Sequence, residues 1–391
     1  MSTRRTFVKF AASIGGALGL SPLTKLPLGA EVVPKPRSDV GRAPAPLDIL
    51  ILGGTGFTGP EQVDYAIARG HRVTLFNRGK TRPGVFKGKV AEELIGDLNN
   101  DTSALEGKKF DVVIDNPTTF PAWVRNAGKF LAGNTKHYIF ISTTSTYSDQ
   151  SIIGLDENSP VHSMPDGLDP YTIDPQHASQ FYGPLKVRAE QEVQKLYPSI
   201  WTVIRPCLIV GPLDRTDRFT YWPARIDKGG EVLAPDKPDD PCQFIDSRDL
   251  AEWTIRMAEA REFGLYNAIG PAHPMTVAEM LYGVKAVTTA GAQFTWVPWD
   301  FLQSQGVRPW RHMTVWQPPY GRTAGYQRRS AKKAIAKGLT FRPVAVTAKD
   351  TLDWHKTRPA ADQIATLNGE INGLAMSKEA EVLKAWHAKN Q

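Results

Sequence analysis

The 391-residue sequence contains only two cysteines, Cys207 and Cys242, and eight scattered histidines. No group of histidine, cysteine or acidic residues has metal-ligand spacing, so the sequence predicts no metal site. Both cysteines lie in apolar, strand-like stretches, which favours two buried thiols. A disulfide between them is the alternative in an oxidising compartment.

The sequence also lacks a dense block of lysine and arginine. Its formal net charge is +7, but residues 1–30 carry four basic residues and no acid, so their removal would leave +3. A charge this mild does not support nucleic-acid binding. The remaining composition is that of one soluble globular chain with room for a large core.

The N-terminal region has no apolar run long enough for a comfortable transmembrane helix. Residues 3–9, Thr-Arg-Arg-Thr-Phe-Val-Lys, fit the twin-arginine export pattern, and a short uncharged stretch follows at 10–23. This pattern predicts a signal peptide over 1–30 and a proline-rich linker over 31–47. We therefore expect a periplasmic protein that uses the twin-arginine export machinery; a disordered basic tail is the alternative.

A glycine-rich turn follows the apolar strand that ends at Leu52. Gly53, Gly56 and Gly59 recur at intervals of three, and a helical pattern begins directly after them. A pyrophosphate needs backbone N–H groups that point at it, and glycine lets the backbone come close enough. The turn therefore predicts a dinucleotide site. The residues expected to line it are Gly53, Thr55, Gly56, Phe57, Thr58 and Gly59.

Strand and helix patterns alternate from residue 48 to about 210, which predicts an open parallel sheet with helices on both faces. The predicted strands are 48–52, 72–76, 111–115, 137–142 and 201–205. The fold class is therefore α/β, a doubly wound Rossmann sheet with a smaller mixed α/β domain for the substrate. The expected division is 48–210 plus 246–269 for the Rossmann domain, 211–245 plus 270–345 for the substrate domain, and a helical tail over 346–391.

Tyr182 and Lys186 stand four residues apart, on one face of a predicted helix. A nearby ammonium group can lower the pKa of a phenol, which would let Tyr182 exchange a proton with a substrate hydroxyl. Upstream, a buried strand ends in the hydroxyl-rich residues 142–146. Each piece alone also has a structural explanation, such as a cap or turn. The ordered set of glycine turn, hydroxyl strand and Tyr/Lys helix is much harder to obtain by chance.

With these motifs the chain resembles the extended short-chain dehydrogenase/reductase superfamily, the NAD-dependent epimerase/dehydratase group. The resemblance covers about residues 48–345. Besides the motifs above it includes Gly96-Asp97, Arg205-Pro206, Gly211-Pro212, Phe244-Ile245-Asp246, Asp249-Leu250 and Tyr266-Asn267.

The resemblance also implies roles for single residues. It places the catalytic hydroxyl at Thr143, with Ser142 and Thr144 as alternatives, and makes Tyr182 the acid/base. It implies that Lys186 binds the nicotinamide ribose and tunes Tyr182. By the same resemblance, Asp97 meets the adenine.

The end of the second strand departs from the family pattern. An NAD-selective site usually places an acid there for the ribose 2′-hydroxyl. This chain instead has neutral Asn77 followed by Arg78, Lys80 and Arg82, which can meet a 2′-phosphate. We therefore expect Asn77 and Arg78 to contact NADP, with NAD as the alternative; a solvated basic turn would also explain the charges.

Two further departures concern the substrate side. The third predicted strand ends in Asp115-Asn116-Pro117, where the family often has small apolar residues. Residues 148–180 are longer than usual and are expected to form a loop over the substrate mouth.

Aromatic residues gather in the predicted substrate domain. They include Tyr221, Trp222, Trp296, Trp299, Trp310 and Trp316. Aromatic faces beside arginine and aspartate suit a small-molecule substrate that is a carbohydrate or an aromatic alcohol. Core or lid packing explains each tryptophan equally well. The sequence leaves a homodimer open.

Export restricts the reaction, because no supply of fresh cofactor is evident outside the cytosol. The first hypothesis is a redox-neutral enzyme with tightly held cofactor, an epimerase or an eliminating enzyme that forms a transient ketone on a sugar or glycoside. Nucleotide sugars are not expected because they are cytosolic. The second hypothesis is a net ketone reductase or alcohol dehydrogenase, and the third is a non-catalytic dinucleotide-binding protein.

Overall fold

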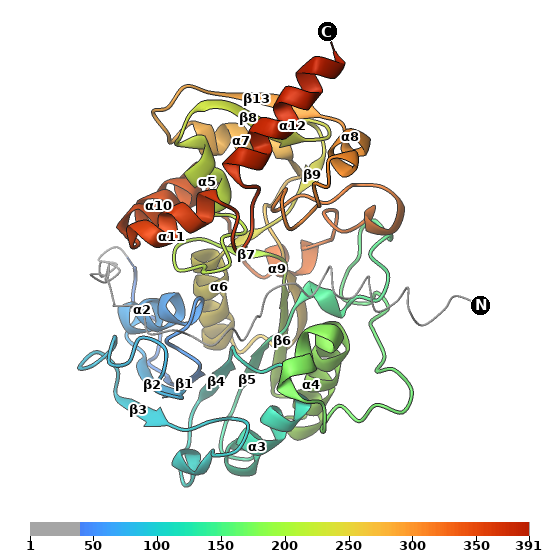
Figure 1. Cartoon of the computed structure of the whole chain (residues 1–391). Helices are drawn as coiled ribbons and strands as arrows, with labels where there is room; N and C mark the ends of the chain where they lie inside the picture. Colours follow the sequence, from blue (N-terminus) through green and yellow to red (C-terminus); the bar gives the residue numbers. More distant parts are fainter. Residues whose placement is uncertain (1–39, 391) are drawn as a thin grey trace.

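The computed structural model describes residues 40–390 of the chain, which form two lobes (Figure 1). The first lobe is built on a seven-stranded sheet with the order β11-β6-β5-β4-β1-β2-β3. Every neighbouring pair in this sheet is parallel. Its strands are β1 (Asp48–Leu52), β2 (Arg72–Asn77), β3 (Glu92–Ile95), β4 (Val112–Asp115), β5 (Tyr138–Ile141), β6 (Trp201–Pro206) and β11 (Gly264–Ala268). The predicted doubly wound α/β fold is confirmed.

Helices cover both faces of the sheet (Figure 1). Ile49 and Ile51 of β1 pack on the side of α2 (Gly59–Arg69) and α6 (Ser247–Ala260). Leu50 and Leu52 pack on the opposite side, with α3 (Pro121–Leu131) and α4 (Tyr182–Leu196). A continuous apolar strand is the pattern expected for a sheet buried on both faces.

The strand order reverses between β1 and β4. The chain proceeds from β1 to β2 and β3 in one direction, then crosses to β4, β5 and β6 in the other. In open parallel sheets, ligands bind outside the carboxyl ends of the strands at such a switch point. The glycine turn after β1 and the residues after β4 and β5 therefore meet there.

The second lobe is mixed and contains short strands and helices around its own apolar core. Its longest strand pair is β8 (Gly230–Pro235) with β13 (Ala292–Val297), which are parallel. The smaller strands are β7 (Ile209–Val210), β9 (Pro241–Cys242), β10 (Ile245–Asp246) and β12 (Met275–Thr276). The helices of the chain after α4, apart from α6, are α5 (Tyr221–Ile226), α7 (Val277–Lys285), α8 (Trp299–Ser304), α9 (Lys332–Ala336), α10 (Val344–Thr357), α11 (Ala360–Leu367) and α12 (Met376–Lys389).

Several segments lie differently from the sequence expectation. Strands β3 and β11 are absent from the predicted strand list, and β3 has the sequence Glu-Glu-Leu-Ile with only Leu94 buried. Helix α9, inside the expected substrate range, contacts β11 of the first lobe. Helices α10 and α12, expected as a tail, contribute Ala348, Val382 and Leu383 to the core of the second lobe.

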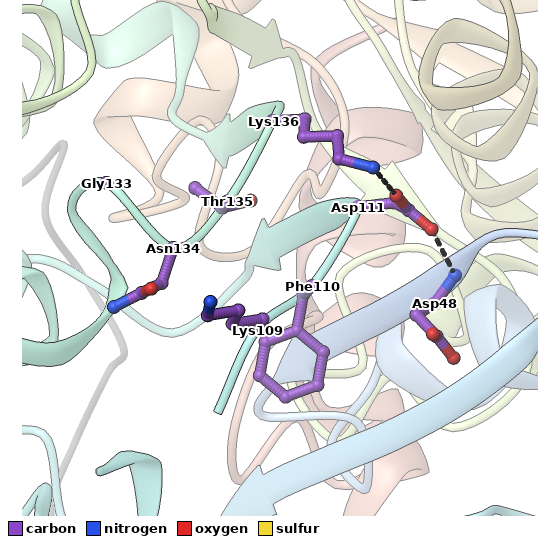
Figure 2. Close-up of a pocket in the computed structure, with 8 residues that line it drawn as sticks. All are labelled: Asp48, Lys109, Phe110, Asp111, Gly133, Asn134, Thr135 and Lys136. Atoms are coloured by element: carbon purple, nitrogen blue, oxygen red, sulfur yellow. Dashed lines mark hydrogen bonds and ion pairs between the residues drawn. The ribbon is translucent and has the colours of Figure 1, made fainter. Parts of the chain in front are cut away.

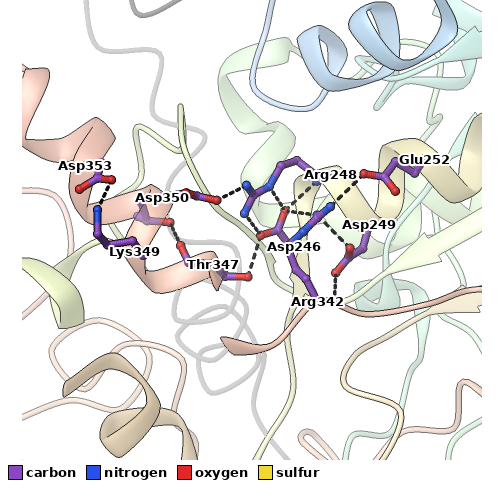
Figure 3. Close-up of polar contacts among 10 residues, drawn as sticks. Asp246, Arg248, Asp249, Glu252, Arg342, Thr347, Lys349, Asp350 and Asp353 are labelled. Atoms are coloured by element: carbon purple, nitrogen blue, oxygen red, sulfur yellow. Dashed lines mark hydrogen bonds and ion pairs between the residues drawn. The ribbon is translucent and has the colours of Figure 1, made fainter. Parts of the chain in front are cut away.

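An ion-pair network joins α6 of the first lobe to α10 and the segment before it (Figure 3). Asp246 caps α6 and accepts hydrogen bonds from Arg248 N at 2.8 Å, Arg342 Nη1 at 3.0 Å and Thr347 Oγ1 at 2.7 Å. Arg248 also pairs with Asp350 of α10. The network therefore fixes the second lobe against the helix that covers the sheet.

Within residues 40–390, no helix is long and apolar enough to cross a membrane. Cys207 and Cys242 are both free and buried. The predicted signal peptide over 1–30 and residues 31–39 of the predicted linker lie outside the described residues.

Candidate active site

The glycine turn after β1 is closely packed on one side and open on the other. Gly53 has φ of +77°, a left-handed conformation that favours glycine. A β-carbon on Gly59 would lie 2.6 Å from Gly54 Cα, so only glycine lets α2 start this close to the turn. A β-carbon on Gly56 would meet only Gly53 O, at 3.8 Å. The open face at Gly56 is the side on which a pyrophosphate could approach.

Gly54 belongs to the same turn and was not among the predicted residues. A β-carbon there would lie 2.5 Å from Leu75 Cδ2, a contact between β1's turn and β2 that no sequence spacing shows. Thr55 of the predicted set is buried, and Phe57 and Thr58 are half-buried. Thr58 makes no side-chain cap on α2, which leaves the N–H groups at the start of the helix for a ligand, apart from Pro60, which has none.

Arg82 binds the outside of the glycine turn. Its Nη2 donates to Thr55 O at 3.0 Å and to Gly56 O at 2.9 Å. The sequence predicts Arg82 among the groups that can meet a 2′-phosphate, whereas in the structure its side chain binds the glycine turn. A second brace joins Gln62 of α2 to Asn116 after β4 through reciprocal amide hydrogen bonds of 3.1 and 2.7 Å.

The end of β2 is the position at which the sequence predicts the adenosine side of the cofactor. Asn77 is buried; its Oδ1 accepts from Gly79 N at 2.7 Å and its Nδ2 donates to Glu93 Oε1 at 3.0 Å. Arg78 is exposed, and Asp97 accepts from Asn99 N at 3.0 Å. Glu93 is not among the predicted residues. It lies in β3, a strand that the sequence does not predict, and this strand places its carboxylate beside Asn77.

Thr143 and Tyr182 lie together at the carboxyl end of β5. Thr143 caps the short 3-10 turn Thr144–Thr146, and its Oγ1 donates to Ser145 Oγ at 3.2 Å. The same hydroxyl lies close enough to the Tyr182 phenol to lower its pKa against the effect of burial. Ser142 instead donates to Glu190. Of the three hydroxyls left open by the sequence, Thr143 is the one that faces Tyr182.

Gly183 makes this approach feasible. A β-carbon at that position would lie 2.4 Å from Ser145 O. The first turn of α4 therefore packs directly on the hydroxyl-rich segment, which brings the Tyr182 side chain to Thr143. This close contact is a further feature that the sequence reading did not identify.

Lys186 is buried one helical turn after Tyr182. Its Nζ donates to Thr118 O at 2.6 Å and to Ile141 O at 2.7 Å, the carbonyls that follow β4 and end β5. Burial lowers the pKa of this ammonium group to about 8, against the opposing effect of Asp115. The ammonium is therefore held at the switch point of the sheet.

A further cation, Arg218, acts on the Tyr182 phenol. Burial raises the pKa of Tyr182, and the Thr143 hydroxyl and the charge of Arg218 oppose this rise. The Lys186 ammonium group donates to two backbone carbonyls, and its expected effect on the pKa of Tyr182 stays a prediction. Arg218 lies in the loop before α5, and no spacing in the sequence connects it to Tyr182.

Arg205 and Asn267, two residues of the motifs that the chain shares with the family, fix the elements around the site. Arg205 forms a buried ion pair with Glu190, 2.6 Å between Nη2 and Oε2. Asn267 accepts the Tyr147 hydroxyl at 2.7 Å. These contacts fix β6, β11 and α4 around the hydroxyl-rich segment.

The predicted aromatic residues belong to the core of the second lobe. Tyr221, Trp222, Trp310 and Trp316 are buried in it, and Trp296 and Trp299 pack against it. Trp299 lies 5.4 Å from Trp316 and Trp310 lies 5.2 Å from Tyr326, between ring centroids. The core explanation therefore holds for these residues.

The segment over 148–180, expected over the substrate mouth, joins the two lobes. Its backbone exchanges hydrogen bonds with the second-lobe segment 325–330: Gly325 N to Gln150 O at 2.9 Å, Gly154 N to Arg328 O at 2.8 Å and Ser330 N to Leu155 O at 2.8 Å. These bonds attach the segment to the lobe that faces the carboxyl ends of the strands.

A separate pocket of about 330 Å³ lies at the other end of the sheet (Figure 2). The Asp111 carboxylate fixes two of the lining residues, because it accepts hydrogen bonds from Asp48 N at 2.9 Å and from Lys136 Nζ at 2.7 Å. Since Asp48 is the first residue of β1, this pocket is remote from the glycine turn. No cluster with metal-ligand character occurs in residues 40–390.

Comparisons with known proteins give one weak sequence match and many structural ones. No family model matches the chain. Over 224 residues the chain is 27% identical to the chloroplast stem-loop binding protein of 41 kDa b from Arabidopsis thaliana, a match that covers 52% of this chain and 53% of that protein. The chain thus spans about half the length of this relative.

Solved structures match over most of their length. A UDP-glucose 4-epimerase has a TM-score of 0.57 at 15% identity, over 80% of this chain and 98% of that one. The Bifidobacterium longum UDP-glucose 4-epimerase in complex with NAD+ and UDP gives 0.55 at 17%, over 80% and 99%. The Bacillus cereus UDP-glucuronic acid 4-epimerase in complex with NAD gives 0.53 at 15%, over 78% and 98%. The chain therefore has the fold of the NAD-dependent epimerase and dehydratase structures.

Proposed function

We propose that this protein is an NAD(P)-dependent oxidoreductase that oxidises a secondary alcohol of a sugar or glycoside. The reaction is redox-neutral overall, because the enzyme then reduces the ketone again, either directly or after an elimination. The observation that carries the proposal is the position of Tyr182 beside the Thr143 hydroxyl at the carboxyl end of β5, where the first turn of α4 packs on the hydroxyl-rich segment. The pair lies on the same edge of the sheet as the glycine turn.

The residues at the switch point fit a dinucleotide. Gly56 leaves an open backbone face, and the first amides of α2 are uncapped. Lys186 supplies a buried ammonium group suited to the nicotinamide ribose. A bound nicotinamide would supply the hydride acceptor for the carbinol carbon and the hydride donor for the return step.

The side chains perform the proton chemistry. Thr143 donates a hydrogen bond to the substrate oxygen, and Tyr182 accepts the hydroxyl proton as general base. The positive charge of Arg218 favours the phenolate that this step needs, because it already opposes the raised pKa of Tyr182. In the reverse direction Tyr182 returns the proton to the oxygen.

For the cofactor we propose NADP over NAD. Asn77 places no charge of its own at the end of β2, and exposed Arg78 follows it. A guanidinium group binds a 2′-phosphate through paired, charge-assisted hydrogen bonds. The carboxylate of Glu93, which holds Asn77, is the feature that favours NAD instead.

We further propose that the protein is exported by the twin-arginine route to the periplasm. Support comes from the sequence of residues 3–9 alone. Replacing Arg4 and Arg5 by lysine in the full chain should retain the protein in the cytosol. Unchanged periplasmic recovery of that variant would refute the assignment.

The reaction is tested by mixing cofactor-loaded protein with glycosides, sugar acids and aromatic alcohols. The near-ultraviolet absorbance of reduced nicotinamide should rise transiently with a true substrate and then fall. A rise that persists supports the net dehydrogenase instead. No rise with any compound, in protein shown to hold oxidised dinucleotide, would contradict an oxidoreductase of this class.

The similarity to a stem-loop binding protein favours a second candidate, a protein that binds nucleic-acid stem-loops. Non-specific binding of a protein to nucleic acid has a Kd of roughly 10⁻⁴ to 10⁻⁶ M at physiological salt. Fluorescence anisotropy with an RNA hairpin should therefore show no tighter binding if the enzyme proposal is right. Tighter, hairpin-selective binding without any turnover would favour the second candidate.

A further inference from the structure

Arg329 is a buried arginine without an acidic partner. Its side chain is 6% exposed, and its guanidinium carbon lies 4.3 Å from the centre of the Tyr326 ring. Nη2 donates to Gln150 Oε1 at 2.5 Å, while Nε has no hydrogen-bond partner. Within residues 40–390 it forms no ion pair, so its charge is balanced only by neutral groups.

The other two arginines buried to this extent are both neutralised. Arg205 and Arg225 are each 4% exposed and pair with Glu190 and Glu379, at 2.6 Å and 2.5 Å. Taking a cation out of water without a counter-ion is costly, and buried charges are normally paired. Burial accordingly lowers the pKa of Arg329. The missing counter-ion therefore calls for an explanation.

Arg218 is a second cation on the same side. It is half-buried, donates from Nε to Thr216 Oγ1 at 2.8 Å, and forms no ion pair with any described residue. Its charge acts on both Tyr182 and Tyr326, and the charge of Arg329 acts on Tyr326 as well. Gln150, the partner of Arg329, also donates to Tyr147 O at 2.8 Å, directly after the hydroxyl-rich residues 142–146.

The carboxylates near these arginines have other partners. Asp217 is paired with Arg358 at 2.7 Å. Asp214 accepts from the Thr216 hydroxyl at 2.6 Å and reaches Arg218 only through it. The second carboxylate oxygen of Asp214 is buried without a hydrogen-bond partner, but no described acid forms an ion pair with Arg218 or Arg329.

We propose that Arg329 and Arg218 form a subsite for a carboxylate of the substrate, so that the compound handled beside Tyr182 is a sugar acid or its glycoside. This inference rests on the proposed function. A guanidinium group matches a carboxylate geometrically and binds it with charge-assisted hydrogen bonds. The subsite lies on the second lobe, while the acid/base lies on the first, so a bound acid spans both.

The competing explanation is structural. Arg329 also links the 148–180 segment to the second lobe, through Gln150 and through its backbone N–H, which donates to Gln243 Oε1 at 3.0 Å. A purely structural arginine would affect stability and would not affect which ligands bind. The two roles can therefore be separated by measuring both.

The test compares sugar acids with their neutral counterparts on cofactor-loaded protein by calorimetry. Glucuronate, galacturonate and gluconate are paired with glucose, galactose and sorbitol. In the wild type at least one acid should bind about tenfold or more tighter than its partner. Arg329→Met and Arg218→Met should each remove most of that preference, whereas Arg215→Met, an exposed neighbour, should keep it.

Three outcomes would overturn the inference. They are equal binding of every acid and its neutral partner, a preference that survives Arg329→Met, and tighter binding of glucose 6-phosphate than of any carboxylate. The unfolding temperature without ligand is measured in parallel. Arg225→Met, which breaks an ion pair, should lower it more than Arg329→Met does.

Failure here is distinguishable from failure of the proposed function. Dinucleotide content and the effect of Tyr182→Phe on turnover do not depend on this subsite. If both behave as proposed while the acid preference is absent, only the carboxylate assignment is wrong.

Discussion

At the scale of single residues, the site combines local patterns with contacts that no local pattern encodes. Tyr182 and Lys186 could be predicted because a spacing of four places them on one helix face. The prediction of Thr143 depended on the family resemblance as well as on the buried strand before it. Arg218 could not be predicted, because it reaches Tyr182 from another lobe and only the fold brings them together.

Replacing Tyr182 by phenylalanine removes the proton acceptor and leaves the ring in place. General acid–base catalysis typically contributes about 10² to 10⁴ in rate, so turnover should fall by at least about a hundredfold. Dinucleotide affinity, measured by fluorescence titration, should remain nearly unchanged. The exposed Tyr282→Phe serves as control; turnover that survives in Tyr182→Phe would refute the acid/base role.

Arg78→Ala tests the choice of cofactor. The loss of a charge-assisted contact to a 2′-phosphate should weaken NADP binding about tenfold while NAD binding stays the same. Titration of both dinucleotides measures this, with the exposed Lys87→Ala as control. Tighter binding of NAD in the wild type, with no effect of Arg78→Ala, would contradict the NADP assignment.

At the scale of elements, the sequence predicts five strands of the sheet and misses β3 and β11. β1 is four buried apolar residues in a row and was predicted, whereas β3 carries Glu92 and Glu93 and was not. The strand order and the docking of α9 on β11 depend on contacts distant in sequence. The local periodicity of the sequence cannot predict such contacts.

Gly59→Ala tests the close start of α2. The added β-carbon would overlap Gly54 backbone atoms, and overpacking typically costs about 1–3 kcal/mol. The free energy of unfolding in urea should fall by that amount, and dinucleotide binding should weaken. Gly291→Ala adds a β-carbon in open space and should leave both unchanged.

The packing of α2 on α6 should depend on pH through Glu259. Burial acts to raise the pKa of its carboxyl, but hydrogen bonds from His71 and Arg69 outweigh this and lower the pKa to about 2. Since the folded pKa lies below the ordinary value of 4.5, the carboxylate stabilises the fold above that value. This contribution is lost as the pH falls from about 4.5 toward 2.

The measurement is the urea midpoint as a function of pH, for wild type and Glu259→Gln. The variant should be less stable near neutral pH, and the difference should shrink in acid. Glu381→Gln, an exposed carboxylate paired only with Lys378, should follow the wild type. A constant difference between wild type and Glu259→Gln at all pH values would show that its charge is not involved.

At the scale of the whole molecule, the second lobe and the 148–180 segment complete the site that the first lobe begins. The ion pairs around Asp246 and the backbone bonds of Gly154 and Gly325 hold the lobes together. A cofactor bound at the glycine turn lies on the edge of the sheet that the second lobe faces. This arrangement suits a cofactor that is retained through many cycles.

The most direct test of this account is the dinucleotide content of the purified, full-length protein. The protein is denatured, and the released nucleotide is identified by absorbance and mass spectrometry. We predict near-stoichiometric dinucleotide in the wild type, and a large loss in Gly56→Val, whose side chain fills the open face of the turn. Empty wild-type protein that also binds added NADP and NAD only weakly would contradict the claim that this chain is an oxidoreductase with a tightly held cofactor.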